Sequence, residues 1–387
     1  MSGSWARWNR SVGRPYTIGV EEEVMLLDAS DNSLAQRSDA VLARLSSELA
    51  DHAFPETHAA VLELATGVHS DVAGAVAELA ALREGLARDL RQLGVDAACA
   101  GMYPLAAPQA TRISGTARYR LIADSMRCLA VREPTMALHV HVGIPDPEEA
   151  IRVLDGLRQS LPLLLALSAN SPFFQGLDSG FASARTVIFG GFPRTGPPRA
   201  FGCYAEYVDA LDALIASGAL PDASFIWWDI RLQPGLGTVE VRVMDAQSSV
   251  AESAPLVALV QSLARSELEG PPRENRVAAE VLAENRFRAA RDGLEARLID
   301  PAHRKLVSVR TLVADLVEPC RPHAAVLGCS EELEQVRRLA AVNGAARQRA
   351  WIQGGGDLGR LVSRLVQQFT AQQRPVSHSI PATERSG

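Results

Sequence analysis

The chain has 387 residues, of which 47% are hydrophobic and 22% charged. These values are ordinary for a packed globular protein of about two to three average domains or one large α/β unit. The net charge is −6, and no basic stripe with interleaved aromatic residues occurs, which argues against a nucleic-acid partner. The five cysteines form no CxxC motif and are typical of reduced thiols in a cytosolic protein.

Neither a secretory leader nor a membrane partner is expected. The N-terminus lacks an apolar core segment of the kind that signal peptides carry. The strongest apolar run, Leu161 to Ala169, is too short to cross a bilayer. We therefore expect a cytoplasmic protein.

The first half of the chain alternates predicted strands and helices. Strands are predicted over Tyr16–Leu27, Val61–Ala65, Val95–Gly101 and Thr135–Ile144. Helices are predicted over Leu34–Ala50, from a Ser70 or Asp71 cap to about Leu93, over Arg118–Ala130, and from an Asp146 cap through Leu164.

The second half is predicted to be mainly helical. Asn170–Gly202 is rich in Gly, Ser, Pro and Arg and is predicted to be a long irregular segment, typical of lids and substrate loops. A helix over Ala205–Ala216, a strand over Thr238–Met244 and further helices from Val250 to about Thr370 follow. We expect residues 1–14 to be flexible, 15–371 to form one domain, and the polar tail 372–387 to be disordered.

Four of the predicted strands share an unusual pattern of charge. Each has one apolar face, and each places acids, histidines or an arginine on the other face. These residues are Glu21, Glu23, Glu63, His139, His141, Glu240 and Arg242. If the strands lie in one sheet, the carboxylates converge, and like charges held close together require a cation or protons.

This set of residues favours a magnesium or manganese site for phosphoryl transfer. Glutamates with one or two histidines suit a hard divalent ion better than zinc, and an arginine can stabilise the transferring phosphate. Taken singly, each motif has a simpler explanation: a solvated acidic run at 21–23, a hydrogen-bonded core histidine, or a cross-strand ion pair between Glu240 and Arg242. The joint pattern is more specific than any one member.

Searches for other catalytic motifs are negative. The chain has no GxxxxGK[ST], GxSxG or HExxH sequence. The glycine-rich run Gly354–Gly359 has no strand before it and is predicted to be a loop before the last helix.

The same residues carry a resemblance to a known family. The segments TIGVEEEVMLLD, LELATGV, ALHVHVGI, NSPFFQGLDSGFASAR, WWDIRLQPGLGTVEVRVMDAQ and ENRFRAARDG, between Thr17 and about Trp351, resemble the carboxylate–amine ligases related to glutamate–cysteine ligase. The resemblance implies an α+β fold like that of glutamine synthetase, in which a curved antiparallel sheet forms a funnel with helices packed outside. It also implies a homo-oligomer.

The resemblance implies roles for individual residues. Metal ligands on the funnel wall are expected to be Glu21, Glu23, Glu63, His139 and Glu240, with Glu56 and His141 as further candidates. Arg242 and Arg231 are expected to face the phosphates or a substrate carboxylate, and Arg185 the nucleotide or substrate. Trp227 and Trp228 are candidates for an acceptor-site wall, with core packing as the alternative, whereas Asn285 and Arg291 are expected to be structural.

The expected reaction consumes ATP and Mg²⁺ and joins the carboxylate of an amino acid, with glutamate as the expected donor, to an amine. The sequence does not identify the amine. A metal-dependent amide hydrolase is the main alternative, because His-x-His on a strand is also typical of zinc hydrolases. A non-catalytic metabolite-binding protein of the same fold is the third possibility.

Overall fold

The computed structural model describes residues 3–11, 13–106, 111–132, 134–270 and 277–371, so the tail predicted to be disordered lies outside the described residues. The strands are β1 (Ile18–Asp28), β2 (Ala53–Pro55), β3 (Val61–Ala65), β4 (Val95–Ala98), β5 (Ala137–Gly143), β6 (Phe173–Phe174), β7 (Leu177–Asp178), β8 (Thr195–Gly196), β9 (Trp227–Trp228), β10 (Ile230–Gln233), β11 (Thr238–Asp245), β12 (Arg297–Asp300) and β13 (Lys305–Ser308).

The α-helices are α1 (Ser38–Leu42), α2 (Ser47–Ala50), α3 (Val72–Arg91), α4 (Ala117–Met126), α5 (Pro147–Leu157), α6 (Leu161–Ser168), α7 (Ala184–Phe189), α8 (Tyr204–Ala216), α9 (Val250–Glu269), α10 (Ala279–Asp292), α11 (Val309–Val317), α12 (Arg321–Leu327), α13 (Ser330–Glu334), α14 (Val336–Ala341), α15 (Gly344–Gln353) and α16 (Leu358–Phe369). None of these helices is long and apolar enough to span a membrane.

One antiparallel sheet organises the molecule. Its strands run in the order β10-β11-β5-β1-β3-β2, and β4 pairs with the second half of β1. The central strand β1 pairs with β5 through residues 18–22 and with β3 through residues 21–25. The predicted α+β fold with an antiparallel sheet is therefore confirmed.

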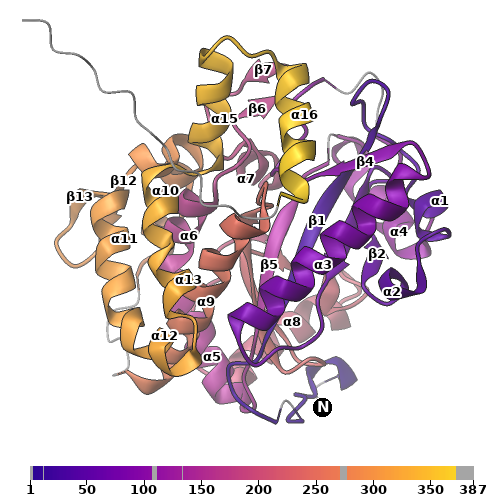
Figure 1. Cartoon of the computed structure of the whole chain (residues 1–387). Helices are drawn as coiled ribbons and strands as arrows, with labels where there is room; N and C mark the ends of the chain where they lie inside the picture. The colour runs from indigo at the N-terminus through magenta and orange to yellow at the C-terminus, as the bar shows by residue number, and fades with distance from the viewer. Residues whose placement is uncertain (1–2, 12, 107–110, 133, 271–276, 372–387) are drawn as a thin grey trace, which may run out of the picture.

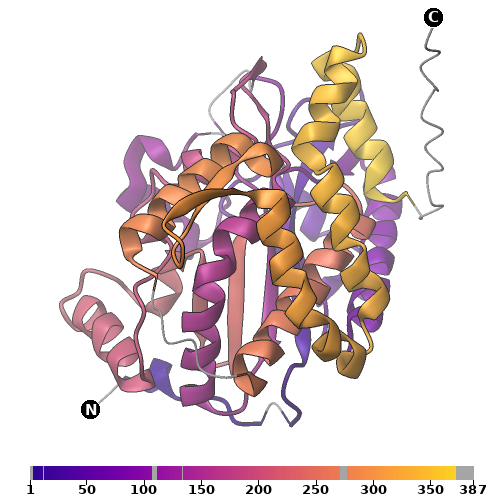
Figure 2. The same cartoon turned by 90° about the vertical axis from the view of Figure 1, so that its left-hand side faces the viewer.

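Helices cover the apolar face of this sheet. Leu138, Val140 and Val142 of β5 pack in one buried cluster with leucines and valines of α5 and α9. In Figure 1, α3 crosses in front of β1 and β5, the orange helices α10 to α13 lie at the left, and the yellow helices α15 and α16 lie at the top. Figure 2 shows the C-terminal helices side by side along the edge of the molecule. The opposite sheet face is thus left for polar side chains.

A buried ion pair ties the sheet to these helices. Glu22 lies between Glu21 and Glu23 in β1 but points to the apolar face, where Arg83 of α3 donates to it at 2.7 Å. Arg83 also donates to the backbone oxygens of Gln247, Ser248 and Phe369. Both side chains are fully buried, so β1, α3, the segment just before α9 and the end of α16 meet at one guanidinium group.

Several predicted elements differ from the structure. The helix predicted over Leu34–Ala50 is wrong, because only α1 and α2 form there and Leu34 makes a β-bridge with Leu27. The helix predicted from Asp146 to Leu164 breaks at a 3₁₀ turn, Arg158–Ser160, before α6 begins at Leu161 with Pro162 in its first turn. The strand predicted to end at Gly101 ends at Ala98.

Short strands and a hairpin were missed elsewhere. The strands β2 and β10 extend the sheet at its two ends, and β12 and β13 form a hairpin within the helical half. The N-terminal segment expected to be flexible packs Trp8 into the core, where its indole donates to the Ile144 oxygen at 2.9 Å. The loop predicted at the glycine-rich run is confirmed for Gly354–Asp357, whereas Leu358 and Gly359 already belong to α16.

Replacement of Glu22 by Gln should destabilise the fold without touching the polar face. Arg83 would then be a buried charge without its anion, which costs about 3 kcal/mol in the free energy of unfolding. The control is Glu48→Gln, which removes an exposed pair with Arg88 at 3.4 Å and should cost less than about 0.5 kcal/mol. Urea unfolding of both variants measures the difference, and equal stabilities would contradict this role for Glu22.

Candidate functional site

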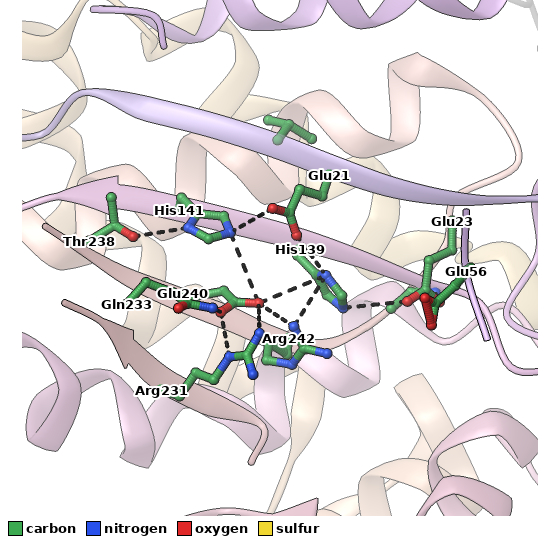
Figure 3. Close-up of polar contacts among 12 residues, drawn as sticks. Glu21, Glu23, Glu56, His139, His141, Arg231, Gln233, Thr238, Glu240 and Arg242 are labelled. Atoms are coloured by element: carbon green, nitrogen blue, oxygen red, sulfur yellow. Dashed lines mark hydrogen bonds and ion pairs between the residues drawn. The ribbon is translucent and has the colours of Figure 1, made fainter. Parts of the chain in front are cut away.

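Cross-strand register brings the predicted polar residues together. Glu21 of β1 pairs with His139 of β5, and Glu23 pairs with Glu63 of β3. Glu240 of β11 pairs with His141 of β5 on one side and with Arg231 of β10 on the other. Directly paired residues share a face of the sheet. The acids and histidines predicted from alternation therefore share one polar surface with Arg242, and Arg231, expected from the resemblance, joins them; Figure 3 shows most of these side chains.

Glu21 links the two histidines. One oxygen lies 3.1 Å from His139 Nδ1 and the other 3.2 Å from His141 Nε2. The second ring nitrogen of His141, Nδ1, lies 2.9 Å from the Thr238 hydroxyl, which fixes the orientation of the ring. Burial works to raise the pKa of Glu21, but the attraction of His141 and a hydrogen bond from His139 hold it below its ordinary value.

Glu240 is surrounded by donors. The Arg231 guanidinium binds it with two nitrogens, at 2.6 and 3.2 Å, and Gln233 donates to it at 2.8 Å. Arg242, two residues along β11, donates to the other oxygen of the same carboxylate. Burial opposes ionisation of Glu240, but Arg231 and Arg242 outweigh it and hold its pKa well below the usual range.

Glu23, Glu63 and Glu56 form the opposite electrostatic environment. Glu23 accepts the Ala137 amide at 2.6 Å, and the Tyr119 hydroxyl lies 3.2 Å from Glu56. Burial, together with repulsion from Glu56, raises the pKa of Glu23 to about 8. Burial and then repulsion from Glu21 and the other two acids raise the pKa of Glu63 well above its usual value. Without a cation, this part of the surface therefore retains protons near neutral pH.

The histidines differ in charge for similar reasons. Burial and the nearby Arg242 lower the pKa of His139 to about 4, so this ring is neutral. Burial also opposes the charged form of His141, but the negative charges of Glu21 and Glu240 outweigh the effect of burial and raise the pKa of His141.

A cavity of about 270 Å³ lies over this surface. The sheet residues that line it, here called the floor, are Glu21, Glu23, Glu63 and His139. His141 and Glu240 do not line the cavity but lie next to these residues. Charged, polar and apolar side chains from other elements complete the wall: Glu56, Thr57, His58, Val61, Arg118, Tyr119, Ile122, Thr135, Arg185, Phe189, Phe192, Ser224, Trp227, Arg231 and Arg242. The helices α4 and α7 supply several of these residues.

The residues present fit a divalent cation. Two groups offer ligand atoms within 4.8 Å of one another, namely Glu21 with His141 and Glu240, and Glu21 with Glu63 and His139. The Nε2 atom of His139 is buried and has no hydrogen-bond partner within the described chain, whereas the buried Nε2 of His141 faces a Glu21 oxygen at 3.2 Å. Buried polar atoms are normally satisfied, so the unpartnered imidazole nitrogen of His139 among carboxylates is suited to a metal ion.

Arg185 lines the cavity and is held in place by a buried network of polar side chains. Its guanidinium lies 3.6 Å from Asp245 and donates to the Val243 oxygen. Asp245 in turn accepts the hydroxyls of Ser171 and Ser183 at 2.7 and 2.8 Å. The sequence prediction missed Asp245 and both serines. Asp245 directly follows the predicted strand and could have been noticed there, but the serines lie in the segment predicted to be irregular.

Other candidates divide between the cavity and the core. Trp227 borders the cavity, whereas Trp228 packs on Phe201 with ring centroids 5.7 Å apart. Asn285 joins α10 to β12 through two hydrogen bonds with Ile299, and Arg291 pairs with Asp292 on the surface. Arg118, Tyr119 and Ser224 also border the cavity and were not singled out, because no strand pattern marks them.

Comparison with known proteins agrees with this geometry. The model of glutamate–cysteine ligase family 2 matches residues 17–364. A putative glutamate–cysteine ligase 2-1 of Rubrobacter xylanophilus is 39% identical over 91% of this chain and 94% of its own length. A putative glutamate–cysteine ligase 2 of Thermobifida fusca is 33% identical over 96% of this chain and 95% of its own length.

Solved structures share the fold at low sequence identity. The glutamate–cysteine ligase of Francisella tularensis in complex with AMP superposes with a TM-score of 0.68 at 14% identity, over 94% of this chain and 91% of that one. A bifunctional glutathione synthetase of Pasteurella multocida gives 0.67 at 15% identity, over 92% of this chain and 52% of that one. Since the family model covers most of the chain and close relatives span its length, the chain belongs to glutamate–cysteine ligase family 2.

Proposed function

We propose that the protein is an ATP-dependent carboxylate–amine ligase that forms an amide, with glutamate as the expected donor, through an acyl phosphate. One observation supports the proposal most directly: buried acids and arginines line the same cavity on the polar face of the sheet. Hydrolysis of an amide needs no such combination, whereas phosphoryl transfer needs cations around the phosphates and positive charge at the transferring group.

The main proposed ligands of Mg²⁺ or Mn²⁺ are Glu21, Glu23, Glu63 and His139. Glu56 is a further proposed ligand. His141 and Glu240 are the remaining proposed ligands, although Glu240 already binds two arginines. Such an ion, when bound, neutralises the developing charge on phosphate oxygens and helps to align them.

The arginines are proposed to act on the transferring group. Arg242 and Arg231 are held by Glu240 at the cavity wall, so their guanidinium groups are positioned before a nucleotide arrives. A fixed positive charge of this kind stabilises the transition state without reorganisation. Arg185, anchored by Asp245, is proposed to contact the nucleotide or substrate from α7.

The reaction follows from these roles. The donor carboxylate oxygen attacks the γ-phosphorus of ATP, and the bond to ADP breaks. The amine then attacks the acyl carbon, an amide bond forms and phosphate leaves. Glu23 and His139 of the floor are buried, and limited access of water would protect the acyl phosphate from hydrolysis.

We further propose that the protein is cytoplasmic and forms a homo-oligomer. Light scattering measures its assembly state.

The reaction class is tested by a screen for ADP release over amino-acid pairs and simple amines. We expect ADP formation that requires both a carboxylate donor and an amine, with a new amide detected by mass spectrometry. Cleavage of amides without ATP would show a hydrolase instead. Nucleotide binding without turnover of any pair would indicate a non-catalytic protein.

Replacement of Glu23 by Gln should abolish ligase activity without unfolding the protein. The amide removes a charged ligand, so we expect kcat/KM to fall by about 100-fold or more. In the absence of Mg²⁺, the melting temperature at pH 7 should stay about the same, because a pKa of about 8 already keeps the Glu23 carboxyl group protonated and uncharged there. The neighbouring variant Glu22→Gln is the matched control, since it loses stability while the residues of the polar face remain in place. Full turnover by a folded Glu23→Gln variant would reject the assignment.

Binding of Mg²⁺ should release protons. Glu23 has a pKa raised to about 8, so its carboxyl group is protonated at pH 7 and must ionise to bind a cation. We expect release of about one proton or more per protein at pH 7 and an affinity that rises with pH up to about 8. Titration calorimetry in two buffers of different ionisation enthalpy measures the released protons. An affinity independent of pH between 6 and 8 would contradict the proposed site.

A further inference from the structure

The positive charges of the cavity differ in how they are balanced. Four arginines of the described chain line it: Arg118, Arg185, Arg231 and Arg242. Arg231 and Arg242 bind Glu240, and Arg185 lies beside Asp245. By contrast, no described carboxylate forms an ion pair with Arg118. The cavity thus contains a cation whose counter-ion is not supplied by the described part of the protein.

Hydrogen bonds to neutral groups hold Arg118 in place. Its side chain lies over the Phe225 ring at 4.8 Å, and its NH1 atom donates to the Ser224 hydroxyl at 2.5 Å. Its NH2 atom donates to the Ser224 carbonyl oxygen at 3.3 Å, and the same oxygen accepts a bond from Arg231 at 3.3 Å. Arg118 is therefore half-buried and oriented, next to an arginine that Glu240 neutralises.

The surroundings favour a carboxylate as the missing anion. Arginine pairs with carboxylates and phosphates through its planar fork of donors. The phosphates of ATP are expected at the acids of the sheet, where cations would gather. Arg118 belongs instead to α4, outside the sheet, and Tyr119 and Ile122 of the same helix line the cavity with it. Glutamate, the expected donor, has one carboxylate more than the reaction consumes, and an amino-acid acceptor keeps its own carboxylate.

We propose that Arg118 binds the α-carboxylate of an amino-acid substrate and so makes the enzyme select amino acids over decarboxylated amines or acids. This inference rests on the proposed ligase function. Either the donor or the acceptor can supply this carboxylate. Substrate analogues that lack only the α-carboxylate distinguish the two sources. Cysteamine is cysteine without its carboxylate, and 4-aminobutanoate is glutamate without its α-carboxylate.

The test measures kcat/KM of the wild type and of Arg118→Ala with three pairs: glutamate and cysteine, glutamate and cysteamine, and 4-aminobutanoate and cysteine. For glutamate and cysteine, loss of one charged contact should lower kcat/KM by about 10- to 100-fold. For the pair that already lacks the contacted carboxylate, the variant should lose less than about twofold, since no ion pair remains to be lost. That pair identifies whether donor or acceptor binds Arg118.

Two further variants guard against a purely structural effect. Arg118→Lys keeps the charge and should retain more discrimination between the pairs than Arg118→Ala. Arg120→Ala removes an exposed arginine of the same helix, bonded to the Gly115 oxygen at 2.7 Å, and should leave all three pairs unchanged. Equal losses of kcat/KM with every pair would overturn the proposal, because Arg118 would then only hold α4 in place. An increase in the KM for ATP alone would also overturn it, because Arg118 would then bind phosphate.

Calorimetric titration of glutamate and cysteine into both proteins makes the same comparison without turnover. Weaker binding of one of them to Arg118→Ala supports the proposal, and unchanged binding of both overturns it. An enzyme that turns over no pair would count against the ligase function, while the binding titration would still decide the role of Arg118.

Discussion

Mutual repulsion among buried carboxylates is the constraint that shapes this molecule. Glu23 and Glu63 are cross-strand partners, and repulsion from Glu56 reaches both. Removing these groups from water costs free energy, and placing them side by side costs more. Apolar packing on the opposite face of the sheet must offset that cost, and there Val20, Val140 and Val142 lie in a continuous buried cluster with α5 and α9. The sheet is thus a rigid support for groups that would otherwise move apart.

The triplet 21–23 shows how one strand separates stability from chemistry. Because successive side chains point to opposite faces, Glu21 and Glu23 face the cavity while Glu22 faces the helices. Glu22 is neutralised by a fixed partner, Arg83, and contributes to the fold. Glu23 lies instead on the cavity face, where burial and repulsion from Glu56 raise its pKa, and there it is a proposed cation ligand. Identical residues in a row therefore have different surroundings because of where the strand places them.

Strand periodicity was sufficient to predict the floor of the site. Alternation alone indicated Glu21, Glu23, Glu63, His139, His141 and Glu240, and register then brings them together as expected. Glu56, Arg185 and Arg231 were named only from the family resemblance, because Glu56 follows the short strand β2 and Arg185 lies in a segment without periodicity. The role of Glu22 was missed, although an acid on an apolar face requires a buried partner and Arg83 lies on the buried side of α3.

The residues of the cavity wall outside the sheet could not be predicted from the sequence, because they come together only through contacts between distant parts of the chain. Arg118 and Ser224 are 106 positions apart in the chain, and no local pattern predicts their contact. Asp245 receives its hydrogen bonds from Asn170, Ser171 and Ser183, which come together only when the irregular segment folds over the end of β11. Regular strands carry the acids that the proposed phosphoryl transfer needs, whereas α4, α7 and the turn before β9 carry the side chains that can distinguish one substrate from another. A ligase built in this way can keep its chemistry constant and change its substrates through residues that do not belong to the sheet.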